Sequence, residues 1–346
     1  MKKFIFILFI IVYTACHQTK PPVAETEAFP VYTTDTTPND TDDPAIWYNK
    51  IDPGQSLILG TDKGDSTGGI FVFDLKGKLI PSLCLTHLAR PNNIDIEYGL
   101  NFNGDEIDIA AFTERGRKML RIISLPDCRF IDNGGIPVFE DEADSLRYPM
   151  GIALYKDRNK NVFAFVTRKK GPVNGYIYQY RLYSTNVTIC AEFVRKFGDF
   201  SGKKEIEAIM VDDALGFVYY SDEGYGIRKY YADAQNGDKQ LALFATSDIA
   251  QDHEGLALYK GQNTSGYIIL SDQQANRLQI FNRRGALLNP HKHTLRRVVK
   301  LQTLESDGID MISLPLNSDF PSGILVAMSA NKTFQYYKAE DIIPAE

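Results

Sequence analysis

Residues 40–47 read Asp40-Thr41-Asp42-Asp43-Pro44-Ala45-Ile46-Trp47, an acid-rich loop that leads directly into an apolar run. Two further apolar and aromatic runs follow, Leu57-Ile58-Leu59 and residues 69–75, and the turn residues Asp74-Leu75-Lys76-Gly77 come after them. Short β-branched and aromatic runs between turns of this kind predict β-strands. This part of the chain therefore predicts an acid-bearing loop, an apolar strand and an aromatic hairpin.

The same unit returns along the chain at intervals of roughly fifty residues, which is typical of the blades of a β-propeller. No amphipathic helix of three turns interrupts the repeat. A β-sandwich or a single sheet would leave so regular a spacing unexplained. We therefore predict an all-β fold, a six-bladed β-propeller. The six units begin near Asp42, Asn92, Pro149, Glu205, Asp252 and Asp307.

The two ends of the repeat predict how the ring closes. The last unit is one strand short, and residues 30–34 contain an additional apolar and β-branched run. An N-terminal strand is therefore expected to complete the final blade. Roughly 300 residues with 44% hydrophobic content can bury a large core. No second linker is present, so residues 30–346 are expected to form a single domain.

The N-terminus resembles a bacterial export signal. Lys2 and Lys3 precede the apolar residues 4–12, and Tyr13-Thr14-Ala15-Cys16 follows. The apolar run is too short to span a bilayer, and small residues before a cysteine indicate lipoprotein processing. We expect a signal peptide at residues 1–15, lipidation at Cys16 and a spacer at residues 16–29. This predicts an exported lipoprotein of the bacterial outer membrane, facing the periplasm or the surface; an ordinary signal peptide is the alternative.

Composition argues against several classes of site. After Cys16 only Cys84, Cys128 and Cys190 remain, without CxxC spacing, so neither a disulfide framework nor a zinc site is indicated, although one pair stays open. The net charge is −6, or −8 without Lys2 and Lys3, and no basic stripe suggests nucleic acid. We expect a monomer that touches the membrane only through its lipid.

Acids and carboxamides gather in the loops of the predicted blades. Equivalent loops of a propeller converge on one end of its central channel, where many carboxylates would repel one another unless cations neutralised them. Calcium accepts six to eight oxygen ligands, whereas zinc would call for histidine or cysteine clusters that are absent. Each acid taken alone is explained as well by a turn. The set as a whole predicts a Ca²⁺ centre.

Basic residues occupy comparable loops. Lys63 follows Gly60-Thr61-Asp62, and Arg115 and Lys169 follow similar strands in the next two units. Cations at the rim of a calcium-filled mouth would form a site for a polyanion with several phosphates, because metal and side chains share its charge. Each of them, considered alone, is equally well a solvated turn residue.

At these residues the sequence resembles the β-propeller phytases. Residues 40–47 look like the family's D-x-D-D-P-A-I-W motif, and Asn92-Asn93-Ile94-Asp95 looks like its N-N-x-D-[VIL] motif. Weaker matches extend the resemblance over about residues 30–340. The resemblance implies a calcium-dependent phosphoric monoester hydrolase of the 3-phytase type. Such an enzyme releases inorganic phosphate from phytate, myo-inositol hexakisphosphate.

The resemblance also implies roles for single residues. Lys63, Arg115 and Lys169 would hold phosphate oxygens, and Glu207 would act with calcium on the attacking water. The implied calcium ligands are Asp43, Asp95, Glu207, Glu223, Asp252, Glu254, Gln273, Asp307 and Asp310.

The chain departs from the family pattern at two positions. Met150 stands where the family often has Tyr, and Lys332 stands where its better-known members have a carboxamide. We interpret Lys332 as a substrate-binding cation that replaces one calcium ion, with a solvated turn lysine as the alternative.

Two other functions are compatible with a propeller of this composition. One is a non-catalytic surface lipoprotein that binds anionic or phosphorylated ligands as an accessory to a transporter. The presence of Lys63, Arg115, Lys169 and Glu207 together argues against it. The other is an esterase or lactonase, but the Gly-x-Ser-x-Gly nucleophile motif is absent.

Overall fold

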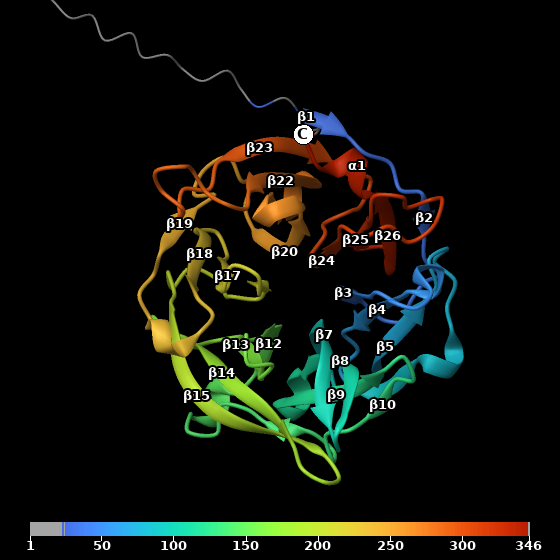
Figure 1. Ribbon diagram of the computed structural model, residues 1–346, viewed down its shortest axis with the longest axis vertical. Helices are drawn as coiled ribbons and strands as arrows, with labels where there is room; N and C mark the ends of the chain where they lie inside the picture. Colours follow the sequence, from blue (N-terminus) through green and yellow to red (C-terminus); the bar gives the residue numbers. More distant parts are fainter. Residues whose placement is uncertain (1–22, 24, 345–346) are drawn as a thin grey trace, which may run out of the picture.

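The computed structural model describes residue 23 and residues 25–344, which fold into six antiparallel sheets arranged around a central axis (Figure 1). Each sheet is one blade, and its strands follow the sequence from the axis outward. The predicted all-β, six-bladed propeller is therefore confirmed. The predicted signal peptide and the predicted lipidation site Cys16 lie outside the described residues.

Blades 1 to 3 hold the first half of the ring. Blade 1 contains β3 (Thr41–Trp47), β4 (Leu57–Asp62), β5 (Gly68–Phe73) and β6 (Leu85–Leu88). Blade 2 contains β7 (Pro91–Phe102), β8 (Asp105–Glu114), β9 (Met119–Leu125) and β10 (Arg129–Phe130), with β11 (Ile136–Pro137) also paired to β9. Blade 3 contains β12 (Pro149–Lys156), β13 (Val162–Arg168), β14 (Asn174–Ser184) and β15 (Ile189–Asp199).

Blades 4 to 6 complete the ring. Blade 4 contains β16 (Ile209–Asp212), β17 (Phe217–Asp222), β18 (Gly226–Tyr231) and β19 (Ala242–Phe244). Blade 5 contains β20 (His253–Lys260), β21 (Gly266–Asp272), β22 (Arg277–Asn282) and β23 (Leu295–Lys300). Blade 6 contains β24 (Ile309–Ile312), β25 (Ile324–Ser329) and β26 (Thr333–Lys338).

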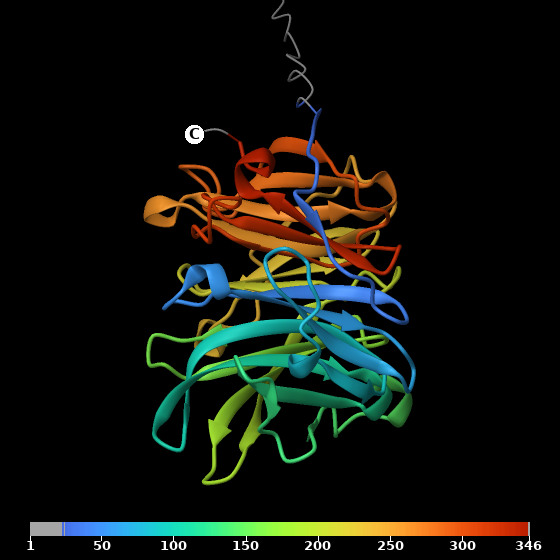
Figure 2. The same cartoon turned by 90° about the vertical axis from the view of Figure 1, so that its right-hand side faces the viewer.

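The N-terminal segment closes the ring at two places. β2 (Tyr32–Thr33) pairs antiparallel with β26 and becomes the outermost strand of blade 6, as predicted. β1 (Glu25–Glu27) pairs parallel with β23 as a fifth strand of blade 5. This places Glu25–Glu27 in the propeller rather than in the predicted spacer of residues 16–29. The short helix α1 (Ala339–Ile342) lies near β1 at the same edge (Figures 1 and 2).

The core of the protein lies between the blades. Among the described residues, buried apolar side chains form six clusters, and each cluster is shared by two neighbouring blades. Cys84, Cys128 and Cys190 are free thiols, so the pair that the sequence left open is not formed. The described part of the chain holds no helix of the length and apolar character that crossing a bilayer requires.

Hydroxyl groups near the ends of the second strands fix the loops around the axis. Thr113 donates a hydrogen bond to the carbonyl of Met150 in the next blade. Ser221 and Ser271 make equivalent bonds to the carbonyls of His253 and Ser306. Each bond ties the end of a second strand to the loop that begins the following blade. The residues just beyond these strands are therefore held at defined positions around the channel mouth.

A buried ion pair joins blades 4 and 5, and it yields a stability prediction. Arg283 donates from Nε and Nη2 to the two carboxylate oxygens of Asp212, each at 2.6 Å. Both side chains are almost completely buried. Arg283→Met should lower the free energy of unfolding by about 3–5 kcal/mol, because it leaves a buried charge unpaired.

Denaturant unfolding measures this loss. The double variant Arg283→Met, Asp212→Leu removes both charges and should recover part of it. A double variant that is no more stable than Arg283→Met would contradict this account.

Candidate active site at the channel mouth

Two sets of loops surround one end of the channel. One set leads from each blade into the innermost strand of the next, and the other follows each second strand. The residue immediately after the second strand lines one cavity in each of blades 1 to 5. The cavity has a volume of about 990 Å³, part of it open to solvent, which is large enough for a highly substituted small molecule. These residues are Lys63, Arg115, Lys169, Glu223 and Gln273.

Blades 1 to 3 supply a cationic side of the mouth. Lys63 Nζ lies 3.1 Å from Asp42 and 3.0 Å from Asp307. Burial alone would lower the pKa of Lys63, but the carboxylates of Asp42 and Asp307 raise it above its ordinary value, so the ammonium stays charged. Lys169 forms an ion pair with Glu205.

Arg115 differs from the two lysines. Among the described residues, no hydrogen bond or ion pair occupies its guanidinium, although it lines the same cavity. Burial lowers the pKa of Arg115, and the nearby Arg90 lowers it further, but guanidinium groups stay protonated in proteins. Arg115 is therefore a preformed, charged donor that is available to an oxyanion.

Blades 4 to 6 supply an acidic side. Glu205, Glu207 and Glu223 each place a carboxylate oxygen within 4.8 Å of the others. Burial raises the pKa of Glu223 to about 9, with further contributions from Glu205 and Asp252. Burial likewise raises the pKa of Glu207 well above its ordinary value, and Asp42 adds to this effect. The nearby lysines therefore do not supply enough positive charge to offset the burial of Glu207 and Glu223.

The acidic side fits a hard divalent cation. Asn92 donates from Nδ2 to Asp42 at 2.9 Å and to Glu207 at 3.0 Å, which fixes both carboxylates. Asn92 Oδ1 and Glu223 Oε1 are buried and have no hydrogen-bond partner. Buried oxygens without donors, beside a group of carboxylates, form the kind of donor set that Ca²⁺ accepts. Glu207, Glu223, Asp252, Glu254, Gln273 and Asp307 all line this cavity.

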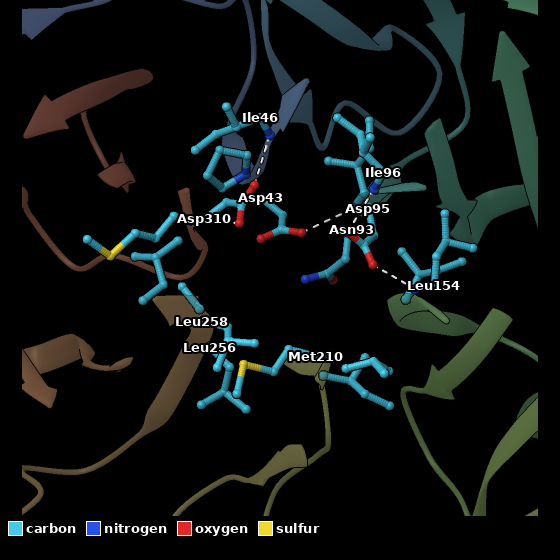
Figure 3. Close-up of a pocket in the computed structure, with 18 of the residues that line it drawn as sticks. Asp43, Ile46, Asn93, Asp95, Ile96, Leu154, Met210, Leu256, Leu258 and Asp310 are labelled. Atoms are coloured by element: carbon cyan, nitrogen blue, oxygen red, sulfur yellow. Dashed lines mark hydrogen bonds between the residues drawn. The ribbon is translucent and has the colours of Figure 1, made fainter. Parts of the chain in front are cut away.

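The other three predicted ligands lie deeper in the channel, in a separate cavity (Figure 3). Asp310 accepts a hydrogen bond from the backbone of Ile46 at 2.8 Å, and Asp43 accepts one from Ile94 at 3.1 Å. Asp95 accepts one from Leu154 at 2.6 Å. These bonds join the innermost strands of blades 6, 1, 2 and 3. The nine predicted ligands therefore lie in two groups, and Asp43, Asp95 and Asp310 also tie neighbouring blades together, a role that the sequence did not indicate.

Lys332 is not brought into the mouth. Its side chain is exposed and its ammonium donates to the backbone carbonyl of Pro38 at 3.0 Å. The Asp307 carboxylate at the mouth pairs with Lys63. This position agrees with the alternative interpretation of Lys332 as a turn residue.

Several residues of the mouth received no role from the sequence. Asp42 and Asn92 orient Lys63 and Glu207, and Glu205 completes the carboxylate group. Arg90, Lys170 and Lys204 add further cations to the cavity wall. The Thr-acid or Ser-acid pair at the end of the second strands, as in Thr61-Asp62 and Ser221-Asp222, is a signal that would have marked the mouth positions.

The fold and the mouth together define a six-bladed propeller with cationic and acidic side chains around one cavity of its channel. The chain belongs to the phytase family, since the family model described as Phytase matches residues 9–338. The 3-phytase of Bacillus subtilis (strain 168) is 29% identical over 316 residues, which cover 88% of this chain and 77% of that protein. A solved structure, the Dos1 propeller, covers 86% of this chain and 68% of its own at 13% identity, with a TM-score of 0.43.

The raised pKa values predict how stability changes with pH. Burial raises the pKa of Asp307 to about 6, against the opposing charge of Lys63, and that of Glu223 to about 9. Between the ordinary carboxyl pKa of about 4 and these values, the folded state binds more protons than the unfolded chain. In excess chelator, the free energy of unfolding should therefore fall as the pH rises from about 5 to 9.

Thermal unfolding at a series of pH values, in chelator and in excess calcium, measures this effect. Calcium should flatten the profile because a bound cation stabilises the ionised carboxylates. Glu223→Gln should make the decline at the highest pH values smaller, while Glu207 and Glu254, whose pKa values burial also raises, should keep part of it. A stability that stays constant across this range in chelator would show that repulsion at the mouth is insignificant.

Proposed function

We propose that this protein is a calcium-dependent phytase that removes phosphate groups from myo-inositol hexakisphosphate and releases inorganic phosphate. Membership of the phytase family supports a phosphoric monoester hydrolase, and the 3-phytase relative supports the substrate. The observation that carries the proposal is the mouth itself. Three cations from blades 1 to 3 and the carboxylate group Glu205, Glu207 and Glu223 of blade 4 line one cavity.

The cationic side binds the reacting phosphate. Arg115 offers two parallel N–H groups to two phosphate oxygens, a geometry that favours bidentate contacts. Lys63 in blade 1 and Lys169 in blade 3 flank Arg115 in blade 2, and each contributes a point charge. In phosphoryl transfer, negative charge is spread over the equatorial oxygens of the reacting group, and these three cations stabilise it there. The further cations Arg90, Lys170 and Lys204 suit a substrate with several phosphates.

The acidic side prepares the attacking water. Calcium bound to this group would screen the substrate charge and lower the pKa of a coordinated water. The Asn92 amide holds Glu207 Oε1 at 3.0 Å, so Oε2 is the oxygen left to accept a proton from water. Asn92 thereby orients Glu207 relative to the phosphate held by Arg115. The two sides of the mouth bring the nucleophile and the phosphorus centre together.

Phosphate release from phytate, measured with calcium and with excess chelator, tests this function. We expect release with calcium and none in chelator, with recovery when calcium is restored. Glu207→Gln should lower turnover by about two to four orders of magnitude and affect substrate binding less.

Glu192→Gln, on the outer strand of blade 3, serves as the matched surface control and should leave turnover unchanged. Phytate that binds without any release of phosphate would favour the non-catalytic binding protein instead. Turnover that persists in Glu207→Gln would remove this residue from the mechanism.

We further propose that the protein is exported and anchored through lipid at Cys16, as the N-terminal sequence indicates. The wild-type protein expressed in a bacterium should label with fatty acid and partition into detergent. Cys16→Ala should lose the label. A wild-type protein that is unlabelled and found outside the membrane fraction would contradict the anchor.

A further inference from the structure

Lys169 and Glu205 form the closest contact between the two sides of the mouth. The Lys169 ammonium contacts both carboxylate oxygens of Glu205. Lys169 belongs to the loop after β13 in blade 3, whereas Glu205 precedes β16 in blade 4. The boundary between the cationic and the acidic sides therefore runs through this pair.

Glu205 has a second set of neighbours. Its carboxylate lies within 4.8 Å of ligand atoms from Glu207 and Glu223. The backbone N–H of Glu223 donates to the carbonyl of Glu205 at 3.2 Å, which keeps the two residues adjacent. A divalent cation bound by this group would therefore use the same oxygens that Lys169 occupies. Ammonium and cation repel each other, so one carboxylate does not serve both at full strength.

The Lys169 ammonium is able to move away from Glu205 without disturbing the fold. Its backbone N–H donates to the carbonyl of Tyr148 at 2.8 Å, so the main chain is fixed. Its side chain is 37% exposed and ends in a flexible stem of four carbons. Only the side chain needs to rotate for the ammonium to turn from Glu205 toward the cavity that Arg115 also lines.

A second pair repeats the arrangement. Lys204 contacts Oδ1 of Asp252, and Gln274 donates to Oδ2 of the same carboxylate at 2.8 Å. Lys63 is different, because it bridges Asp42 and Asp307 and is only 14% exposed. Lys169 is thus the one of the three predicted phosphate-binding cations whose availability depends on a single carboxylate.

We propose that Glu205 is a positioning residue that holds Lys169 back from the substrate phosphate until a divalent cation occupies the Glu205, Glu207 and Glu223 carboxylates. This inference rests on the proposed phytase function. The cation and the lysine exchange partners: the cation takes the carboxylate, and the released ammonium takes a phosphate oxygen. Cation binding and phosphate binding are therefore coupled, and each must strengthen the other by the same factor.

Phytate binding in excess chelator, where no turnover occurs, tests the exchange. Calorimetry on Glu205→Gln should show an affinity about three- to tenfold higher than that of the wild-type protein, because Lys169 is already released. Glu192→Gln is the matched control. It removes an exposed carboxylate that pairs with Arg181 on the outer strands of blade 3, and should change the affinity by no more than about twofold.

Lys169→Met separates release of the lysine from general loss of negative charge. In the Lys169→Met background, Glu205→Gln should give no further gain in affinity for phytate. A gain that persists without Lys169, or an equal gain in Glu192→Gln, would overturn the inference. Thermal unfolding of each variant confirms that the compared proteins are folded.

The wild-type protein also distinguishes failure of this inference from failure of the proposed function. If the wild-type protein releases phosphate with calcium, but wild type and Glu205→Gln bind phytate equally well in chelator, the exchange is overturned. The proposed phytase function would then still stand. A wild-type protein that releases no phosphate with calcium would overturn both.

Discussion

Packing between neighbouring blades holds the ring closed, and the site depends on it. Each of the six buried apolar clusters is shared by two blades, so no blade has a complete core of its own. Burial of apolar surface between blades is the dominant favourable contribution to such a fold. The mouth residues come from all six blades, and their distances are therefore set by these interfaces. The carboxylates repel one another, yet the ring keeps them together.

The residue that follows the second strand has a positively charged side chain in some blades and a negatively charged one in another. The residue after the second strand is Lys63, Arg115 or Lys169 in blades 1 to 3, and Glu223 or Gln273 in blades 4 and 5. A repeated fold presents these positions in equivalent geometry, so the choice of side chain alone decides which side is cationic. A protein with net charge −6 thereby gains a local positive field toward a polyanion.

The repeat explains which features of the fold and of the site could be predicted from the sequence. Strands, blade number and the closing strand near Tyr32 followed from the pattern of apolar runs, because every blade repeats the same alternation. Lys63, Arg115 and Lys169 were found for the same reason, since they share one register. β1 gave no signal because Glu25-Thr26-Glu27 has no apolar pattern, and its pairing depends on an edge that only the folded blade 5 provides.

The sequence could not predict in the same way which acids lie at the mouth and which lie deeper in the channel. Asp43 is adjacent to Asp42 in sequence, but the register between β3 and β4 shifts between Thr41 and Pro44, and the two side chains face different surroundings. Asp42 orients Lys63 at the mouth, whereas Asp43 accepts the backbone N–H of Ile94 deeper in the channel. The backbone partners of Asp95 and Asp310 belong to neighbouring blades, and sequence distance does not reveal them.

Lys63 connects ring closure to the site. Blades 1 and 6 come from opposite ends of the chain, and β2 completes blade 6 from the N-terminal side. Lys63 Nζ bridges Asp42 of blade 1 and Asp307 of blade 6 across this seam. The cationic side of the mouth begins at this residue, and the acidic side ends at Asp307. The seam that joins the chain ends is thus also one of the places where the two charged sides meet, so any opening of the closing strand would separate cationic from acidic side chains.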